Sequence, residues 1–147
     1  RRAALTDLDA IKNLADAHKH ELGFVLRPAL ASSIGREEVF IAQNSQDVIG
    51  FVEYHHRRDH QTTLYHIAVE SHHRRQGIGR LLVDELIRDA GEHEKEFIQL
   101  KCPADLEANE FYRSLGFNRV DTRPNKDRRL VIWNYRLVSN LRSGGDV

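Results

Sequence analysis

The stretch RRQGIGR, residues 74–80, places three arginines and two glycines between an apolar run and a helical pattern. The first N–H groups of a helix have no partner within the helix, and the helix dipole favours negative charge beside them. Glycine lets an anion approach the backbone closely. The residue types and their spacing therefore predict an anion-binding turn at the start of a helix.

Two familiar nucleotide motifs do not fit this turn. A dinucleotide-binding fingerprint has a third glycine three residues after the second one, where this chain has Leu82. A P-loop ends in glycine and lysine followed by serine or threonine, and no such sequence follows Gly79. The remaining interpretation is a site suited to a pyrophosphate, without the residues that phosphoryl transfer needs.

The turn resembles the most specific motif of the GNAT superfamily of acetyl-CoA-dependent N-acetyltransferases, Q/R-x-x-G-x-G/A, through Arg74, Gly77 and Gly79. A second stretch, NEFYRSLGF at 109–117, is similar to the family's other signature, an aromatic–tyrosine pair followed by Leu-Gly-Phe. The resemblance covers nearly the whole chain. It implies that the N–H groups of residues 75–80 hold the CoA diphosphate.

The same resemblance implies further contacts with acetyl-CoA. The backbone of the strand that ends at Val69 would run beside the pantetheine arm, and the Val69 N–H would lie near the thioester carbonyl, where an oxyanion develops. The implied binding residues are Ile67, Ala68, Val69, Arg74, Arg75, Gln76, Gly77, Ile78, Gly79 and Arg80, together with Asp105, Asn109 and Tyr112.

The candidate general acid is Tyr112, which matches the family tyrosine that hydrogen-bonds the CoA sulfur. In a helix expected over 104–115, Asp105, Asn109 and Tyr112 lie one turn apart on a polar stripe. The family usually has asparagine seven residues before the tyrosine, where this chain has Asp105, whereas Asn109 lies three before it. Either residue could contact the pantetheine, and a tyrosine packed at the edge of the core is the alternative role for Tyr112.

The candidate general bases are Glu53, which lies in one apolar strand, and His66, which lies in the next. Strand alternation places Tyr65 and His66 on opposite faces, so we expect only one of them to point into a given cleft. An imidazole titrates near neutral pH. We slightly favour Glu53, because a carboxylate can attract an ammonium group and then help to deprotonate it, and ordered water is a third possibility.

The nine histidines raise the question of a metal site. Adjacent histidines in a strand, such as His55 and His56, point to opposite faces and do not easily share one ion, and no H-E-x-x-H motif or cysteine pair supports them. We therefore expect no metal. The single cysteine, Cys102, is expected to be a small buried residue rather than an acyl carrier.

Composition places the chain among ordinary globular proteins. It has 147 residues, 40% hydrophobic and 30% charged, with a formal net charge of zero. The zero net charge gives no reason to expect nucleic acid or a membrane surface as a partner, and no apolar run approaches the roughly 20 residues of a membrane span. One cysteine suits a reducing compartment, so the default location is the cytoplasm. Because the chain begins RRAAL, we expect residues to precede Arg1 and a first strand to begin there.

Hydrophobic periodicity and turn residues predict the elements that must position these side chains. Helices are expected over 6–22, 27–35, 77–92 and 104–115, and strands over 37–43, 47–58, 62–70, 96–101, 117–123 and 129–138. This order predicts an α+β fold of the GNAT type, with helices packed on a mostly antiparallel sheet. We expect one domain over 1–139 and a frayed tail over 140–147.

The predicted function is direct transfer of acetyl from acetyl-CoA to a primary amine of a small molecule, peptide or protein. The alternative is a CoA-binding module without turnover, or a nucleic-acid-binding protein that uses the basic hairpin at 119–129. Retention of Tyr112 favours the enzyme. If the hairpin does not bind nucleic acid, it is a solvated surface, a contact for the CoA 3′-phosphate or an acidic acceptor, or the interface of a homodimer. Its basic residues are Arg119, Arg123, Lys126, Arg128 and Arg129.

Overall fold

The computed structural model describes residues 1–137. The helices are α1 (Leu8–Ala17), α2 (Lys19–Leu22), α3 (Arg27–Gly35), α4 (Ile78–Glu92) and α5 (Ala108–Ser114), with 3-10 turns at Leu5–Asp7 and Ser71–His73. The strands are β1 (Val39–Asn44), β2 (Asp47–His56), β3 (Gln61–Val69), β4 (Phe97–Pro103), β5 (Asn118–Asn125) and β6 (Arg128–Arg136). The predicted tail at 140–147 lies outside the described residues.

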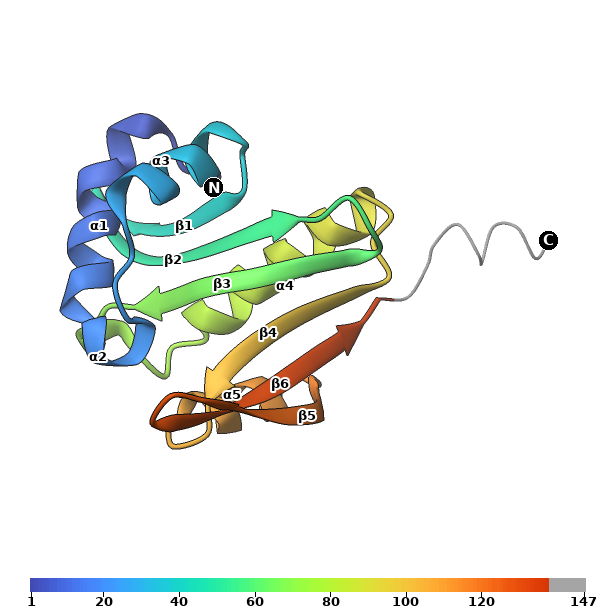
Figure 1. The fold of residues 1–147 in the computed structure, drawn as a ribbon. Helices are drawn as coiled ribbons and strands as arrows, with labels where there is room; N and C mark the ends of the chain where they lie inside the picture. Colours follow the sequence, from blue (N-terminus) through green and yellow to red (C-terminus); the bar gives the residue numbers. More distant parts are fainter. Residues whose placement is uncertain (138–147) are drawn as a thin grey trace. The chain divides into compact units, whose positions relative to one another are not determined.

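The strands form one sheet in the order β1-β2-β3-β4-β6-β5 (Figure 1). The β1–β2, β4–β6 and β5–β6 pairs are antiparallel, and β3 pairs with β4 in parallel at Gln61 to Thr63. A mixed, mostly antiparallel sheet with helices confirms the predicted fold class. None of the helices within residues 1–137 is long and apolar enough to cross a membrane.

The described chain forms two compact units. The first contains residues 1–55 and 64–86, and the second contains residues 56–63 and the chain from Ile87 onward. That all of 1–139 behaves as one domain stays a prediction.

The apolar face of α1 forms part of the hydrophobic core of the first unit. In α1, Ile11, Leu14 and Ala15 recur at helical spacing and are buried, together with Leu30 of α3 and Phe51 of β2. In Figure 1, α3 lies in front of β1 and β2. Residues 1–3 run antiparallel to β1, because the Ala3 N–H donates to the Val39 carbonyl and Arg2 pairs with Phe40.

The helix predicted over 6–22 is interrupted at His18, which separates α1 from α2. The His18 side chain is buried, and its Nδ1–H donates to the Leu14 carbonyl at 2.9 Å. This carbonyl is the one that the His18 backbone N–H would reach in a continuous helix, and that N–H instead donates to Ala15. Competition from the side chain therefore explains the break.

In the second unit, the helix predicted to start at residue 104 starts at Ala108 instead. The Asn109 side chain closes the preceding turn, because its Nδ2 donates to the carbonyls of Pro103 at 2.9 Å and Leu106 at 2.8 Å. Its Oδ1 accepts the Trp133 indole N–H at 2.9 Å. The predicted polar stripe is therefore wrong, since Asp105 lies in the turn outside α5.

Asn109→Ala is expected to lower the free energy of unfolding by about 1–3 kcal/mol, because it leaves the buried Trp133 N–H without this acceptor and opens the turn. Urea unfolding measures the loss. Asn118→Ala, at the exposed start of β5, is the matched control and should cost less than about 0.5 kcal/mol. Equal losses in the two variants would contradict this structural role.

Candidate active site

The predicted anion-binding turn is a loop between β3 and α4. Arg75 and Gly77 both adopt left-handed backbone conformations, with φ of 62° and 81°. The Gly77 carbonyl accepts the Leu81 N–H at 3.0 Å, so α4 opens at Ile78. The N–H groups of Ile78, Gly79 and Arg80 therefore lie in the first helical turn, where no helical carbonyl precedes them. The predicted turn at the start of a helix is therefore present, and that it holds a diphosphate stays a prediction.

Arg74 connects this loop to α2 and to the end of β3 through hydrogen bonds. Its Nη2 donates to Glu21 Oε1 of α2 at 3.2 Å, and its Nε donates to the Val69 carbonyl at 3.4 Å. The arginine that opens the predicted motif thus contacts a carboxylate and the end of β3. Glu21 was not among the residues selected from sequence, since nothing local connects it to a loop about fifty residues later.

Glu70 holds the 3-10 turn that leads into the loop. Its carboxylate accepts the His72 N–H at 3.2 Å and the His73 Nδ1–H at 2.5 Å. The hydrogen bond from His73, followed by that from His72, lowers the pKa of Glu70. Because the pKa is lower in the folded chain, this contact is fully present above the ordinary carboxyl pKa and is lost as pH falls through the lowered value.

Glu70→Gln is expected to raise amide hydrogen exchange across residues 71–77 roughly 2- to 5-fold at neutral pH, because a neutral amide replaces a charge-assisted acceptor. Exchange measured by mass spectrometry tests this. Glu37→Gln, an exposed glutamate of the same unit, is the control. Lowering the pH of the parent protein below the depressed Glu70 pKa should have the same local effect. Unchanged exchange in Glu70→Gln would show that the carboxylate does not hold the turn.

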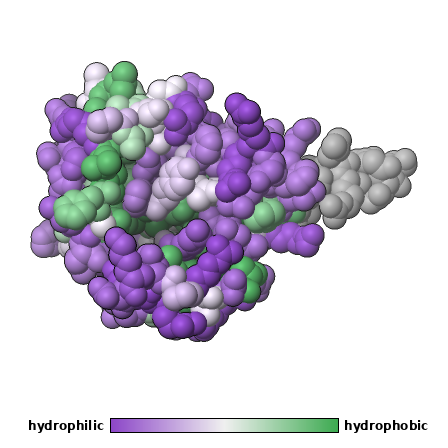
Figure 2. Space-filling view, in the orientation of Figure 1, coloured by the Kyte–Doolittle hydropathy of each residue, from purple (hydrophilic) through white to green (hydrophobic). Residues whose placement is uncertain are grey.

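A cavity of about 440 Å³ lies in the first unit, beside the segment that joins α2 to α3. Its lining residues are Phe24, Val25, Leu26, Ala29, Ser32, Ser33, Arg36, Glu53, Tyr65 and His66. Phe24, Leu26 and Tyr65 are exposed apolar residues. In Figure 2, apolar side chains gather on the side of the molecule where α2 and α3 lie in Figure 1. The cavity therefore combines an apolar rim with polar groups.

Glu53 and His66 form one hydrogen-bonded pair in this cavity. The His66 Nδ1–H donates to Glu53 Oε1 at 2.7 Å, and the Ser33 hydroxyl donates to Glu53 Oε2 at 2.7 Å. The Glu53 side chain is 4% exposed and that of His66 is 25% exposed. Since both carboxylate oxygens are engaged and Nδ1 is the donor, Nε2 is the basic nitrogen left on the imidazole. Two residues that the sequence suggested as alternative bases are thus hydrogen-bonded to each other.

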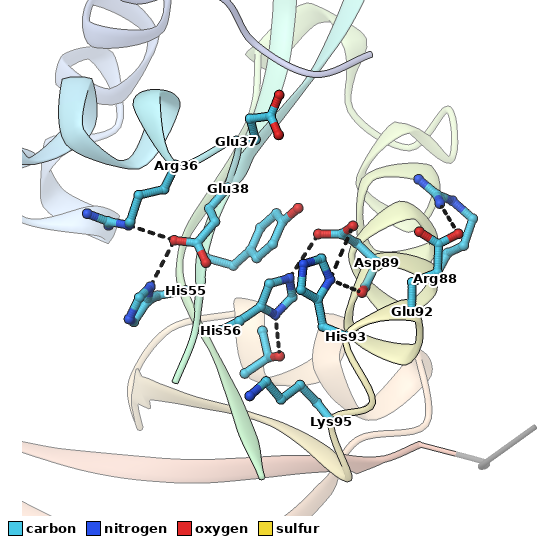
Figure 3. A network of polar contacts seen from close by, with 12 residues as sticks. Arg36, Glu37, Glu38, His55, His56, Arg88, Asp89, Glu92, His93 and Lys95 are labelled. Carbon is cyan, nitrogen blue, oxygen red and sulfur yellow. Dashed lines mark hydrogen bonds and ion pairs between the residues drawn. The ribbon is translucent and has the colours of Figure 1, made fainter. Parts of the chain in front are cut away.

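Arg36 extends this polar arrangement to a second imidazole–carboxylate pair. Its Nη2 donates to the Ser33 hydroxyl at 3.2 Å and its Nε donates to Glu38 Oε1 at 2.8 Å. His55 Nδ1–H donates to the same Glu38 oxygen at 2.8 Å (Figure 3). Ser33 and Arg36 were missed from sequence, because polar residues on a short helix carry no signal of the strand that they will meet.

Two further features concern the side chains at the cavity and a glycine of β2. Tyr65 and His66 are both among the residues that line the cavity, and Tyr65 is half-exposed. Which of the two side chains points into the cleft stays a prediction. Gly50 of β2 was not among the site residues predicted from the sequence. A Cβ at this position would lie 3.2 Å from the Ala68 carbonyl and from Leu82, so glycine lets the first turns of α4 pack closely. A glycine inside a strand pattern is the signal that could have found it.

In the second unit, Tyr112 is buried, and its ring packs against Phe111 and Phe117 with centroid distances of 5.4 and 5.8 Å. Asp105 is exposed and pairs with Arg128 at 3.0 Å, which lowers the pKa of Asp105. The Asn109 amide is held by its turn. Which of the two residues contacts the pantetheine stays a prediction. Cys102 is buried, as predicted.

The basic hairpin contains its own acceptors. Besides the pair of Arg128 with Asp105, Arg123 lies 3.7 Å from Asp121 and Arg129 donates to the Thr122 hydroxyl at 3.0 Å. Part of its positive charge is therefore balanced locally, which fits the prediction of a solvated hairpin.

Comparison with known proteins identifies the family. Residues 35–119 match the model of the acetyltransferase (GNAT) domain, whereas no curated protein sequence matches. The ribosomal-protein-S18-alanine N-acetyltransferase of Escherichia coli is 26% identical, with 93% of this chain and 92% of that chain covered and a TM-score of 0.74. The ribosomal-protein-alanine N-acetyltransferase of Brucella melitensis is 25% identical, with 93% and 98% covered and a TM-score of 0.77. A putative acetyltransferase of Salmonella typhimurium, solved with its cofactor acetyl-CoA, is 19% identical, with 94% and 92% covered and a TM-score of 0.79, and supports the fold. The chain belongs to the GNAT acetyltransferase family.

Proposed function

We propose that this chain transfers acetyl from acetyl-CoA directly to a primary amine, and that the acceptor is the α-amine at the start of a polypeptide. The observation that carries the proposal is the Glu53–His66 pair, a buried carboxylate bonded to an imidazole that lines a cavity with an apolar rim. A base that lines a cavity can deprotonate an amine bound there.

The loop before α4 is proposed to hold acetyl-CoA. Left-handed Arg75 and Gly77 turn the backbone there, and the helix start supplies N–H groups for a diphosphate. The residues proposed to hold it are those from Arg74 to Arg80, with the backbone of Ile67 to Val69 along the pantetheine. These assignments rest on the motif and on the local backbone of the first unit.

His66 is proposed as the general base. Its Nε2 takes a proton from the acceptor ammonium, and Glu53 stabilises the imidazolium that forms. The neutral amine attacks the thioester carbonyl carbon, so a C–N bond forms while negative charge develops on the oxygen near the Val69 N–H. The C–S bond then breaks, and Tyr112 gives its proton to the CoA thiolate. The acylated nitrogen gives its extra proton to solvent, Tyr112 regains one from solvent, and His66 releases to solvent the proton that it took from the ammonium.

The base and the rim both favour an α-amine. An α-amino group has a pKa of about 7.7–8.0, whereas lysine has about 10.4, so an imidazole removes a proton from the former with a much smaller free-energy cost. Exposed Phe24 and Leu26 can contact the first side chains of a peptide. The names of two relatives, which describe ribosomal-protein-alanine N-acetyltransferases, support the same class.

An acceptor panel tests this proposal through CoA release from acetyl-CoA. It contains peptides with a free N-terminus, the same peptides blocked at the N-terminus but carrying lysine, and small polyamines. We expect release with the free N-termini. Release only with lysine or polyamines would overturn the α-amine assignment. If acetyl-CoA binds and no amine in the panel causes release, transfer itself is contradicted.

Gly77→Val is expected to weaken acetyl-CoA binding roughly 10- to 100-fold, because a β-branched residue is strained at a φ of 81° and its side chain points into open space beside the loop. A Cβ at Gly79 should crowd the diphosphate in the same way. Loss of one arginine, as in Arg75→Ala, should cost less, since backbone N–H groups carry most of the binding.

Calorimetric titration with acetyl-CoA measures these affinities. Gly23→Val is the matched control, because Gly23 also has a positive φ, 73°, with open space around a built Cβ, but lies outside the loop. A folded Gly77→Val or Gly79→Val protein that binds as tightly as the control would contradict the proposed diphosphate site.

A further inference from the structure

Three potential metal ligands meet in the second unit, and none of them is among the residues proposed for acetyl transfer. His56 ends β2, Asp89 lies in α4, and His93 directly follows that helix. One ligand atom from each residue lies within 4.8 Å of the others. Figure 3 shows the three side chains directed toward one another. Since the cluster combines two imidazoles with one carboxylate, its donor set is typical of zinc.

His56 is held in the orientation of a metal ligand. Its Nδ1 lies 2.8 Å from the hydroxyl of Thr62, which is fully buried and can accept an Nδ1–H when an ion occupies Nε2. Its Nε2 faces Asp89 Oδ2 at 2.9 Å. Ligating histidines commonly donate their other N–H to a fixed acceptor, which sets the tautomer and the ring orientation. Thr62 is such an acceptor, and Nε2 is therefore the ligand atom.

The two ring nitrogens of His93 also have different roles. Its Nδ1–H donates to the Asp89 backbone carbonyl at 2.9 Å, so Nε2 is again the nitrogen available for coordination. Asp89 and His93 are four residues apart, a spacing that places both side chains on one side of a helix. The two imidazole rings are stacked with centroids 4.1 Å apart. The same Nδ1 lies 3.7 Å from Asp89 Oδ1, so the His93 side chain must turn to bring Nε2 to an ion held by His56 and Asp89.

Burial distinguishes this cluster from a surface group of polar residues. The side chains of Asp89 and His56 are 2% and 8% exposed, whereas His93 is 51% exposed. A buried carboxylate needs a cation beside it, and either an imidazolium or a metal ion supplies one. The half-exposed His93 leaves one side through which an ion and its water can enter.

We propose that His56, Asp89 and His93 form a binding site for one divalent transition-metal ion, with Zn²⁺ as the preferred ion and water as the fourth ligand. Tetrahedral zinc places its ligand atoms about 3.3 Å apart. His56 Nε2 and Asp89 Oδ2, at 2.9 Å, are already near this spacing, so only the half-exposed His93 must approach. Binding replaces the proton between His56 and Asp89 and fixes the end of β2 to α4.

The expectation that the histidines form no metal site rested on adjacent residues in one strand. That part of the reasoning is correct, because His55 contacts Glu38 and His56 contacts Asp89 (Figure 3). The overlooked ligands, Asp89 of α4 and His93 directly after that helix, lie 33 or more residues later in the chain. The site does not depend on the proposed function, so its absence would leave the acetyl-transfer mechanism unchanged.

Titration of the full chain with Co²⁺ alone, followed by visible absorption, tests the site. The protein must carry no polyhistidine tag. The variants are His93→Ala, which removes one half-exposed ligand, and the control His72→Ala, which removes a histidine of the first unit with a 91% exposed side chain. Circular dichroism checks that each variant is folded.

We expect the parent protein and His72→Ala to bind one equivalent of Co²⁺ with the strong bands of tetrahedral coordination, and Zn²⁺ to abolish these bands. In His93→Ala the affinity should fall by roughly 100-fold or more, and Zn²⁺ should no longer raise the Tm. Thr62→Val should weaken binding by about 10- to 100-fold through the orientation of His56. Equal titrations of His93→Ala and the control, or no bands with the parent protein at millimolar Co²⁺, would overturn the proposal in favour of an imidazolium–carboxylate pair.

Discussion

Tyr112→Phe is expected to lower kcat by roughly 10- to 1,000-fold while leaving acetyl-CoA affinity almost unchanged. The Tyr112 ring is buried against Phe111 and Phe117, and phenylalanine keeps that packing while removing one hydroxyl. If Tyr112 protonates the departing thiolate, the loss appears in the chemical step. Steady-state rates with a chemistry-limited acceptor measure it.

Tyr135→Phe is the matched control for this prediction. Tyr135 belongs to the same unit, and its ring packs against the same Phe117 with a centroid distance of 5.2 Å. Its variant should retain nearly full turnover, because no role in proton transfer is proposed for it. Unchanged turnover in Tyr112→Phe, under conditions where chemistry limits the rate, would remove Tyr112 from the mechanism.

His66→Ala is expected to lower kcat/KM by roughly 100- to 10,000-fold, because it removes the nitrogen proposed to deprotonate the acceptor. Initial rates at subsaturating acceptor measure the loss. The chain offers a close control in His55→Ala. His55 also donates to a buried glutamate, at 2.8 Å compared with 2.7 Å for His66, but it does not line the cavity. Similar losses in the two variants would indicate a general structural effect instead of base catalysis.

Glu53 is expected to act through His66. Glu53→Gln keeps the size of the side chain but removes the charge that stabilises an imidazolium, so it should lower kcat/KM less than His66→Ala does. Ser33→Ala removes the hydroxyl that donates to Glu53 Oε2. It should lower kcat/KM even less than Glu53→Gln does, mainly through kcat. This order of effects would be reversed if Glu53 took the proton itself.

The order of helices and strands could be predicted because each depends on local periodicity and on turn residues. The two wrong helix boundaries share one cause. At His18 and at Asn109, a polar side chain bonds to a backbone carbonyl and changes where the helix ends or begins. A helical pattern of apolar residues continues across both positions, so it cannot reveal this competition.

The loop at 74–80 could be predicted for the same local reason, since the glycines and the start of α4 lie within one short segment. The Glu53–His66 pair could not, because the strand register that brings these residues together is set by packing. Sequence reasoning therefore treated them as alternatives. The supporting donors Ser33 and Arg36, and the acceptor of Arg74, Glu21, come from helices whose placement no local pattern specifies.

The pH dependence of kcat/KM, measured with one fixed acceptor for the parent protein, His66→Ala and Glu53→Gln, distinguishes His66 from the other candidate bases. If His66 is the base, the parent protein has an ascending limb that disappears in His66→Ala and survives, at a lower rate, in Glu53→Gln. Loss of the limb in Glu53→Gln alone would make the carboxylate the base. The same limb in all three proteins, moving only when the pKa of the acceptor is changed, would show that solvent carries the proton and would contradict the assignment of His66.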